Sequence, residues 1–350
     1  MDALFDTADM IGTLHTIHVP NTFFLSTFFD MDPFLSDKEH IVFDEVLEDL
    51  PTMAPFVSPL VAAKPQKSSG FSTKIFKPAY VKPLHAVKPG DGMRRMAGEA
   101  MGGTMSAEQR VLNKAIDLLR IQKSQIIARC EWMAANAVVN GKVIIKGEDY
   151  PEVEIDFGRK AELTKDVSGD ATGKWSTVGN DIGSQLEDWS EELLTESGFA
   201  GTDVIMDKKA WRALKKNTGF QNDLDRRRGV DNVPVVTPRK PMQGVEYKGK
   251  WGAFELWLYT GTQRDQSGAK VSVLAAGEIS MVARPGQPRG GIAGIKAFGA
   301  IQDLDSMEAV EMFPKSWTEK NPSVRQLMTQ SAPLMIPGRP NASMKAKVVA

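Results

Sequence analysis

Residues 106–141 read SAEQRVLNKAIDLLRIQKSQIIARCEWMAANAVVNG, and this stretch decides the fold class. Ser106 can cap a helix, Gln109 completes a capping box, and Gly141 is a natural stop. The pattern predicts one helix of about 34 residues, which spans roughly 50 Å and is about three times the average length. Its apolar face is expected to hold Val111, Ala115, Leu118, Leu119, Ile126, Ile127, Cys130, Ala134, Ala137 and Val138. Charges expected on the remaining surface are Arg110, Lys114, Lys123, Arg129 and Glu131.

Two extended segments precede this helix. Residues 1–60 hold an aromatic cluster around Phe23 and Phe28, but prolines separate their apolar pieces, so they are too interrupted to build a core and too apolar to be a free tail. We expect them to lie along other surfaces, of the same subunit or of its neighbours. Residues 62–103 are typical of a long β-ribbon, with possible strands at Phe71–Phe76 and Ala79–Val87 and a glycine-rich end. A loop of about 40 residues is rare in compact domains and usually carries function.

Charge is sorted sharply between these two segments. Residues 1–60 contain eleven Asp or Glu and one Lys, a net of −10, whereas residues 61–98 contain eight Lys or Arg and one Asp, a net of +7. This sorting predicts electrostatic pairing, within the chain or between copies. The alternative is that the basic loop faces DNA or solvent. The candidate inter-subunit contact residues are Lys74, Lys77, Lys82, Arg94, Arg95, Asp44, Glu45 and Glu48.

The chain after the long helix alternates short helices and strands, which gives an α+β pattern. The polar stretches 164–180 and 219–250 are expected to be mostly loop, and the last fifty residues alternate short apolar pieces with proline. The predicted elements are a hairpin of Lys142–Lys146 and Glu152–Phe157, helices at Asp181–Ser197 and after Asp207, and strands at Val204–Met206, Phe254–Tyr259, Val271–Ala275 and Glu278–Ala283.

Composition bounds the class of protein. The 350 residues are 42% hydrophobic and 25% charged, which fits a folded chain, and the net charge of −1 by itself predicts neither nucleic-acid nor membrane binding. No apolar run is long enough to span a membrane, and the acidic N-terminus lacks the layout of a signal peptide. Cys130 is the only cysteine, so an intramolecular disulfide is impossible; its position on the helix predicts a small apolar filler.

The residues do not assemble a recognisable site for catalysis, a cofactor or a metal. The stretch Gly169–Trp175 has three residues between its glycines and a Trp after Lys174, so it departs from a phosphate-binding loop. The pairs His15 with His18 and Asp303 with Asp305 lack further ligands. No Gly-x-Ser-x-Gly elbow occurs, and the basic cluster of residues 226–228 is expected to be a solvated loop. We therefore expect no enzyme activity, no cofactor and no metal.

Several short stretches resemble, in the same order, the lambda-type phage major capsid protein family, often called capsid protein E. Each stretch alone is weak, but their colinear order over nearly the full chain is highly specific, while residues 164–250 resemble the family mainly in layout. The stretches are Phe56–Leu60, Tyr80–His85 with Arg94 and Arg95, Asn140–Lys142, Val153–Gly158, Ile301–Asp305, Pro314–Trp317 and Gln330–Leu334.

The resemblance implies the Hong-Kong-97-type capsid fold. It implies a head protein that self-assembles into hexamers and pentamers of an icosahedral shell enclosing double-stranded DNA, without sequence-specific contacts. The implied partners are further copies of the chain, a scaffolding protein, a portal and a head decoration protein; the implied location is the virion, after assembly in the host bacterial cytoplasm. The implied division is 1–60 as N-terminal arm, 61–103 as extended loop, 104–163 with 300–350 as peripheral domain including the spine helix, and 164–299 as axial domain.

Two rival functions remain at this point. An encapsulin-like compartment shares the fold but encloses enzymes, and packaged DNA rather than protein cargo would separate the two. A head-maturation hydrolase belongs to another class and needs a Ser/His or Ser/Lys site, which these residues do not supply.

Overall fold

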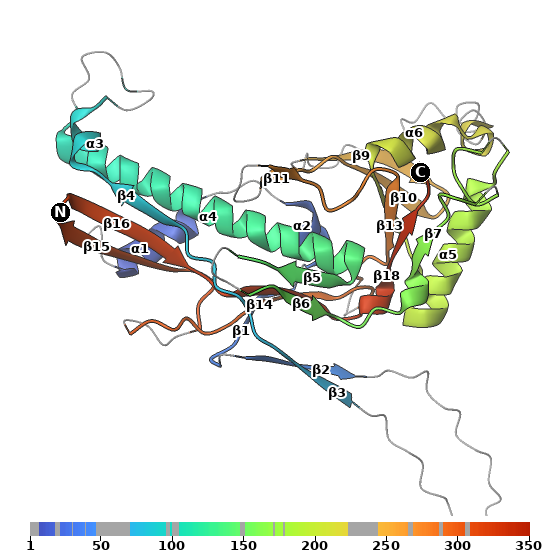
Figure 1. Ribbon diagram of the computed structural model, residues 1–350, viewed down its shortest axis with the longest axis horizontal. Coiled ribbons are helices and arrows are strands. Elements are labelled where there is room, and N and C mark those ends of the chain that lie inside the picture. The colour runs from blue at the N-terminus through green and yellow to red at the C-terminus, as the bar shows by residue number, and fades with distance from the viewer. Residues whose placement is uncertain are drawn as a thin grey trace, which may run out of the picture.

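The structure is a computed structural model in which an elongated body is built around one long helix (Figure 1). The side chains at positions 8, 43–46 and 71–74 lie outside the description. The described residues are 7–17, 22–29, 31–38, 40–46, 71–95, 99, 105–147, 151–170, 172–177, 179–222, 244–264, 269–286, 290–304 and 309–350.

Helices and strands alternate irregularly along the chain, as the α+β pattern predicts. The helices are α1 (Thr7–Thr16), α2 (Phe23–Phe28), α3 (Pro89–Met93), α4 (Ala107–Asn140), α5 (Ile182–Ser197) and α6 (Lys208–Lys216), with 3-10 turns η2 (Ala161–Leu163) and η3 (Pro340–Ala342). The strands are β1 (Phe34–Leu35), β2 (Ile41–Val46), β3 (Phe71–Phe76), β4 (Leu84–Val87), β5 (Lys142–Ile145), β6 (Val153–Asp156), β7 (Thr164–Asp166), β8 (Asp203–Met206), β9 (Val245–Trp251), β10 (Phe254–Tyr259), β11 (Gln263–Arg264), β12 (Lys270–Val271), β13 (Glu278–Val282), β14 (Gly294–Phe298), β15 (Phe313–Lys320), β16 (Ser323–Gln330), β17 (Pro333–Pro337) and β18 (Ser343–Lys347).

Helix α4 has the length and the ends that its sequence predicts. The Ser106 side chain accepts a hydrogen bond from the Gln109 backbone N–H, and the Gln109 side-chain oxygen accepts one from the Ser106 backbone N–H. At the other end Gly141 adopts the left-handed conformation, with φ of 67°. The Arg159 side chain donates to the carbonyl oxygens of Val138 and Val139, which the helix leaves without intrahelical partners. Burial lowers the pKa of Arg159 to about 10.

A six-stranded sheet forms the end of the molecule away from the start of α4 (Figure 1). Its strand order is β7-β18-β13-β8-β10-β9, with β8 parallel to β10 and antiparallel to β13. Because side chains alternate along a strand, Val204 and Met206 contact helices α5 and α6 on one face, whereas Ile205 packs into the cluster that contains α2 and the end of α4. The sheet is therefore covered on both faces.

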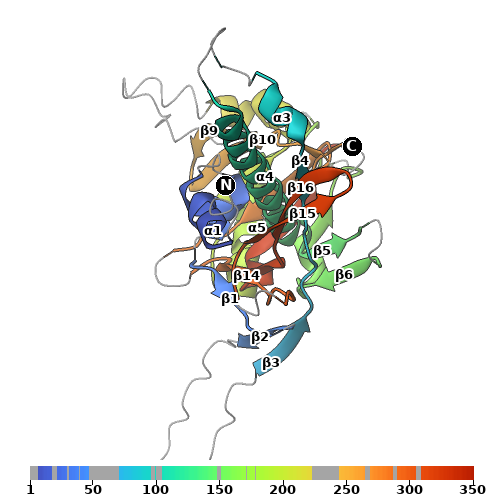
Figure 2. The same cartoon turned by 90° about the vertical axis from the view of Figure 1, so that its left-hand side faces the viewer.

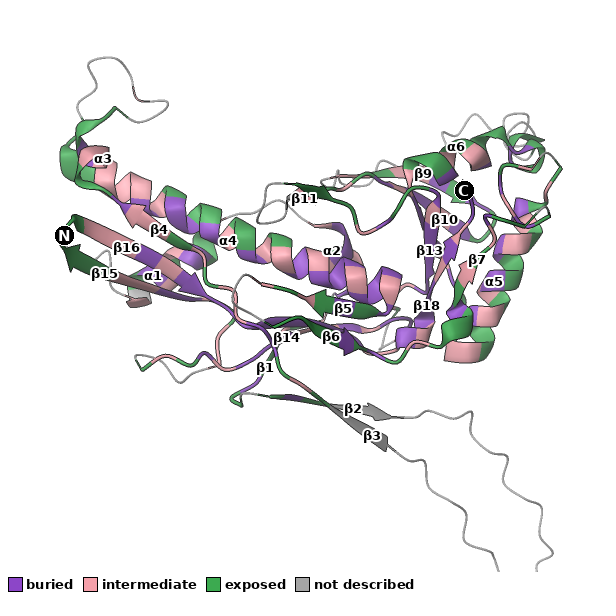
Figure 3. Ribbon diagram, in the orientation of Figure 1, coloured by how far each residue is buried: buried purple, intermediate pink, exposed green. Residues whose placement is uncertain are grey.

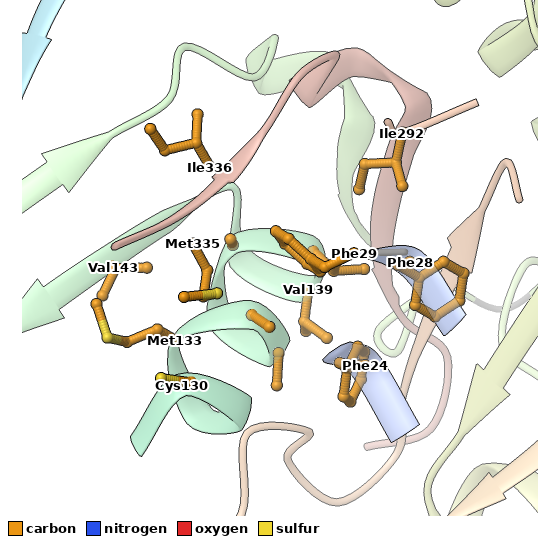
Figure 4. Close-up of a cluster of buried hydrophobic side chains, with 14 of the residues drawn as sticks. Phe24, Phe28, Phe29, Cys130, Met133, Val139, Val143, Ile292, Met335 and Ile336 are labelled. Atoms are coloured by element: carbon orange, nitrogen blue, oxygen red, sulfur yellow. The ribbon is translucent and has the colours of Figure 1, made fainter. Parts of the chain in front are cut away.

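The peripheral part of the body packs along α4. The three-stranded sheet β15-β16-β4 lies beside the first half of the helix, together with α1. The sheet β1-β14-β17 lies beside its second half, and the last turns of α4, from Cys130 on, are mostly buried (Figure 3). Buried side chains from α2, α4, β5 and β17 meet in one core cluster there, which includes Phe24, Met133, Val143 and Met335 (Figure 4).

Strands β2 and β3 form a two-stranded ribbon that extends below the body in both views (Figures 1 and 2). They pair antiparallel from Ile41 opposite Phe76 to Val46 opposite Phe71. Strand β2 belongs to the expected arm and β3 to the expected loop, so the division expected at residue 60 lies in sequence between two paired strands of one ribbon.

Most local predictions are confirmed, and the exceptions have a physical cause. The hairpin β5–β6, helix α5 with its buried Ile182, Leu186, Trp189 and Leu193, and the Asp207 cap of α6 are where the sequence predicts them. Two expectations differ from the structure: residues 245–250 of the stretch expected to be mostly loop belong to strand β9, and of the strand expected at Val271–Ala275 only Val271 lies in a strand, β12. Strand β9 pairs with its neighbour in sequence, β10, and this hairpin pairing stabilises a stretch whose own residues show only a weak strand pattern.

Candidate assembly surfaces

Helices α1 and α2, from the segment expected to be an N-terminal arm, pack on their own subunit. Phe23, Phe24, Phe28 and Phe29 are fully buried in the core cluster, and the prediction of an aromatic cluster that lies along another surface is confirmed for the same subunit. The Phe23 ring centroid lies 5.0 Å from that of Trp257 on β10. Burying a large apolar side chain contributes about 1.5–3 kcal/mol, so this cluster is a strong anchor for helix α2.

Glu131 on α4 binds the first turn of α2. Its two carboxylate oxygens accept hydrogen bonds from the backbone N–H groups of Phe24 and Leu25, each at 2.9 Å, and its exposed fraction is only 6%. A carboxylate at a helix N-terminus satisfies amide groups that lack partners and interacts favourably with the helix dipole. Burial raises the pKa of Glu131, although these hydrogen bonds oppose the shift. The expectation that Glu131 lies on the charged surface of the helix is therefore wrong.

Lys123, two turns earlier on α4, binds the other arm helix at its opposite end. The Lys123 ammonium group donates to the carbonyl oxygens of Leu14, at 2.5 Å, and Ile17, at 2.8 Å, at the C-terminus of α1. A cation is favourable there because the last carbonyl groups of a helix carry partial negative charge. Burial lowers the pKa of Lys123. Glu131 and Lys123 thus hold the two arm helices against one spine.

Gln122 attaches the return of the extended loop to the same helix. Its side chain is fully buried, donates to the Leu327 carbonyl oxygen at 2.7 Å and accepts from the Thr329 hydroxyl at 2.6 Å. It also lies 3.2 Å from Nδ1 of His85 on β4. Desolvation, followed by the positive charge of Lys114, lowers the pKa of His85. The buried side-chain amide of Gln122 therefore connects α4, β16 and β4.

Four of the stretches that carry the family resemblance meet in space. The Tyr80 hydroxyl donates to the Ala300 carbonyl oxygen at 2.7 Å and accepts from the Gln302 backbone at 3.0 Å. The Asp303 carboxylate accepts from Lys315 at 2.8 Å and from the buried Gln330 at 2.7 Å. These four stretches therefore contact one another in the folded chain.

The eight residues predicted to contact other subunits do not form one surface. Asp44, Glu45 and Lys74 lie on the ribbon backbone, where Phe43 is opposite Lys74 and Asp44 is opposite Thr73. Lys77 and Lys82 are exposed just beyond it, and the Lys82 ammonium lies 5.0 Å from the centroid of the Tyr80 ring. Arg94 and Arg95 are exposed after α3, at the other end of the molecule (Figure 3). Glu48 lies outside the described residues.

The ribbon presents an apolar surface that sequence reasoning missed. Val42 and Ile75 lie opposite each other on β2 and β3, and they are 47% and 65% exposed. Paired β-branched side chains stabilise a sheet when other apolar side chains cover them. A projecting two-stranded ribbon has no core of its own that could cover this pair. A signal for this pair was present, since alternation along residues 41–46 and 71–76 places both on one face.

The residues weighed for chemistry occupy ordinary structural positions. Trp175 is buried and donates its backbone N–H to Val348, so residues 169–175 do not open a helix as a phosphate loop does. Asp303 pairs with Lys315, His15 is exposed, and His18, Asp305 and residues 226–228 lie outside the described part. Among described residues no group of three metal-ligating side chains occurs, and no described helix is long and apolar enough to cross a membrane.

Cys130 lies in the core cluster of Figure 4, as predicted for a small apolar filler. It is 4% exposed, and burial raises the pKa of its thiol to about 12. The nucleophilic thiolate is therefore scarce at neutral pH.

Comparison with known proteins agrees with this geometry. The family model for phage major capsid protein E matches residues 6–348. The chain is 29% identical to the major capsid protein of Escherichia phage lambda, over 97% of each chain. It is 30% identical to that of Enterobacteria phage P21, over 95% of this chain and 96% of the other.

Among solved structures, a prophage capsid protein from Escherichia coli CFT073 is similar with a TM-score of 0.73 at 23% identity, covering 99% of both chains. A phage-related protein from Bordetella bronchiseptica is similar with a TM-score of 0.52 at 9% identity, covering 97% of this chain and 95% of the other. The chain therefore belongs to the phage major capsid protein E family, as a structural head protein of a tailed phage with the Hong-Kong-97-type fold.

Proposed function

We propose that this chain is the repeated subunit of an icosahedral shell, in which hexamers and pentamers enclose double-stranded DNA. The observation that carries the proposal is the projecting ribbon with its exposed apolar pair, Val42 and Ile75. An exposed apolar pair on a ribbon is stabilised when a neighbouring copy covers it, and a closed shell repeats that contact with symmetry.

The parts of the subunit have separate tasks in this proposal. Residues 1–60 are the arm, 61–103 the extended loop, 104–163 with 300–350 the peripheral domain, and 164–299 the axial domain. Three side chains of α4 support the separation of arm, loop and spine helix. Glu131 and Lys123 hold the arm helices on α4, and Gln122 holds β4 and β16 there. A scaffolding protein, a portal and a decoration protein complete the head, which assembles in the host bacterial cytoplasm before it becomes the virion capsid.

The opposite net charges of residues 1–60 and 61–98 add electrostatic attraction to the contact between neighbouring copies. In this proposal Lys74, Lys77, Lys82, Arg94 and Arg95 contact acids of an adjacent copy, including Asp44, Glu45 and Glu48. The in-chain pairing of β2 with β3 also brings the acidic and basic segments together within one subunit. Charge reversal of Lys77 and Lys82 alone, which lie beyond the ribbon, therefore tests the electrostatic contact between copies. It leaves the residues of the β2–β3 pairing within one copy unchanged.

The test of the proposed function is assembly of the full chain, expressed with its scaffold and imaged by electron microscopy. The parent should form shells, tubes or capsomers, whereas Val42→Ser with Ile75→Ser should stay folded and lose assembly. The matched control, Val42→Ile with Ile75→Val, keeps the apolar surface and should assemble. A strictly monomeric parent under every assembly condition would refute the function, and shells filled with protein cargo instead of DNA would favour the encapsulin-like rival.

A further inference from the structure

Helix α5 exposes three acidic side chains and no basic one to solvent, next to the exposed Ser184, Leu194 and Thr195. Glu187, Asp188 and Glu191 are exposed on the side opposite its buried stripe, and the helix contains no Lys or Arg. Its two remaining acids, Glu192 and Glu196, pair with Lys165 and Lys160. These two ion pairs leave the other three acids without an ion partner among the described residues.

Helix α6 presents an entirely basic face. Its nine residues, KKAWRALKK, contain five cations and no acid. Lys208, Arg212 and Lys215 are exposed, follow one another at spacings of four and three, and therefore lie on one side of the helix. Within the described part of the chain none of these three has an ion partner. The exposed Lys216 extends the same surface, while Lys209 donates to the backbone of Ala350.

The two helices contact opposite edge strands of one sheet. Lys165, which pairs with α5, is on the edge strand β7. Lys248, on the other edge strand β9, lies 5.6 Å from the centroid of the Trp211 ring of α6. Because the strand order places β7 and β9 at the two ends of the sheet, the contacts of α5 and α6 reach opposite edges of the one face that both helices cover. Figure 1 shows α6 at the top of this end of the molecule and α5 below it, next to β7.

We propose that the acidic face of α5 in one copy contacts the basic face of α6 in the next copy around each hexamer or pentamer. This inference rests on the proposed shell function and deepens it by naming a second contact, distinct from the ribbon. A contact between two different patches of the same chain is heterologous, and it generates a ring when the rotation between copies closes. Each exposed ion pair is weak, but every copy of a ring repeats the set.

A second copy explains both faces, and DNA explains only one. The basic face of α6 alone is a fair candidate for phosphate contacts. The acidic face of α5, on the same domain and of complementary charge, would repel DNA. DNA binding by α6 is therefore kept as an outcome of the test.

Two charge-reversed variants of the full chain test the proposal. The first carries Glu187→Lys, Asp188→Lys and Glu191→Lys, and the second carries Lys208→Glu, Arg212→Glu and Lys215→Glu. Each should stay folded, with a parent-like circular dichroism spectrum, and should lose shell yield about tenfold or more at low salt, where the Debye length is about 30 Å. The chain that carries all six reversals restores every contact and should assemble. The controls Glu187→Asp with Glu191→Asp and Lys208→Arg with Lys215→Arg keep the charges and should assemble like the parent.

Mixing the two reversed variants gives the sharpest readout. One variant is basic on both faces and the other is acidic on both, so copies that alternate around a ring satisfy every contact. A ring of six can alternate and a ring of five cannot. An equimolar mixture should therefore form hexamers, tubes or sheets but few closed shells in electron micrographs.

The outcomes separate the proposals. Reversed variants that assemble like the parent would overturn the contact between α5 and α6, while assembly of the parent would still support the shell function. A parent that never assembles would overturn the function itself. If the α6 variant forms normal empty shells and loses only DNA retention, the face binds DNA and the contact between copies is wrong.

Discussion

Removing the Glu131 carboxylate by Glu131→Ala tests whether the spine helix holds the arm. The change leaves the buried N–H group of Phe24 and the partly buried N–H group of Leu25 without acceptors, and a fully buried group costs about 1–3 kcal/mol. Part of this loss is offset because a buried carboxylate, whose raised pKa reports its desolvation, is itself unfavourable. We therefore expect the free energy of unfolding to fall by about 2–4 kcal/mol.

The assay is urea unfolding of the subunit, combined with limited proteolysis of the arm. Trp257 lies 5.0 Å from Phe23, so its fluorescence should report release of α2. Asp117→Ala is the matched control, since Asp117 is an exposed acid on the same helix, and should change stability by less than about 0.5 kcal/mol. A Glu131→Ala protein with parent-like stability and a protected arm would refute the reasoning.

The same carboxylate predicts a pH dependence whose sign is fixed. The folded pKa of Glu131 is raised above its ordinary value of 4.5, so the folded state binds a proton more tightly than the unfolded state. The contribution of this group to stability is full below about pH 4.5 and is lost as pH rises through the folded pKa. Glu131→Gln should abolish this downward slope while the remaining acids keep theirs, and an unchanged slope in unfolding measured across that window would contradict it.

Three further predictions concern the same helix. Cys130→Ala should assemble normally with a stability loss of about 1–2 kcal/mol. The parent thiol should react with a maleimide only on unfolding, because it is buried and its pKa is raised to about 12. Rapid labelling of the folded chain would count against this. Ile126→Asp places a charge at a fully buried position and should abolish soluble protein, at a cost of several kcal/mol. Ile127→Asp, at the half-buried neighbour, should be milder in the same expression assay. Equal effects would mean that the assignment of the buried face of α4 is wrong. Lys123→Met should leave the carbonyl groups of Leu14 and Ile17 without their cation and speed proteolysis after α1, and Arg120→Met, at an exposed position, is the control.

Local chemistry explains what the sequence predicted correctly. The capping box of Ser106 and Gln109, the Gly141 stop and the Asp207 cap each act within a few residues, and the stripe from Ile182 to Leu193 repeats at the helical period. The family resemblance was also readable, because short stretches in a fixed order survive changes elsewhere. The contacts among these stretches could not be predicted from the sequence, since Tyr80 binds Ala300 and Asp303 binds Gln330 only in the folded chain.

The sequence by itself therefore determined the spine helix, the α+β class and the family, together with the sorting of charge between residues 1–60 and 61–98. Only the tertiary structure decided that β2 pairs with β3 and that residues 245–251 are a strand. It also decided that Glu131 is buried and that the partly buried Lys123 binds the end of α1. A helical pattern shows which face a side chain occupies, but the contacts of Glu131 come from backbone groups more than 100 residues earlier in the chain. The burial of a charged residue depends on such distant partners, and periodicity along a single helix carries no information about them.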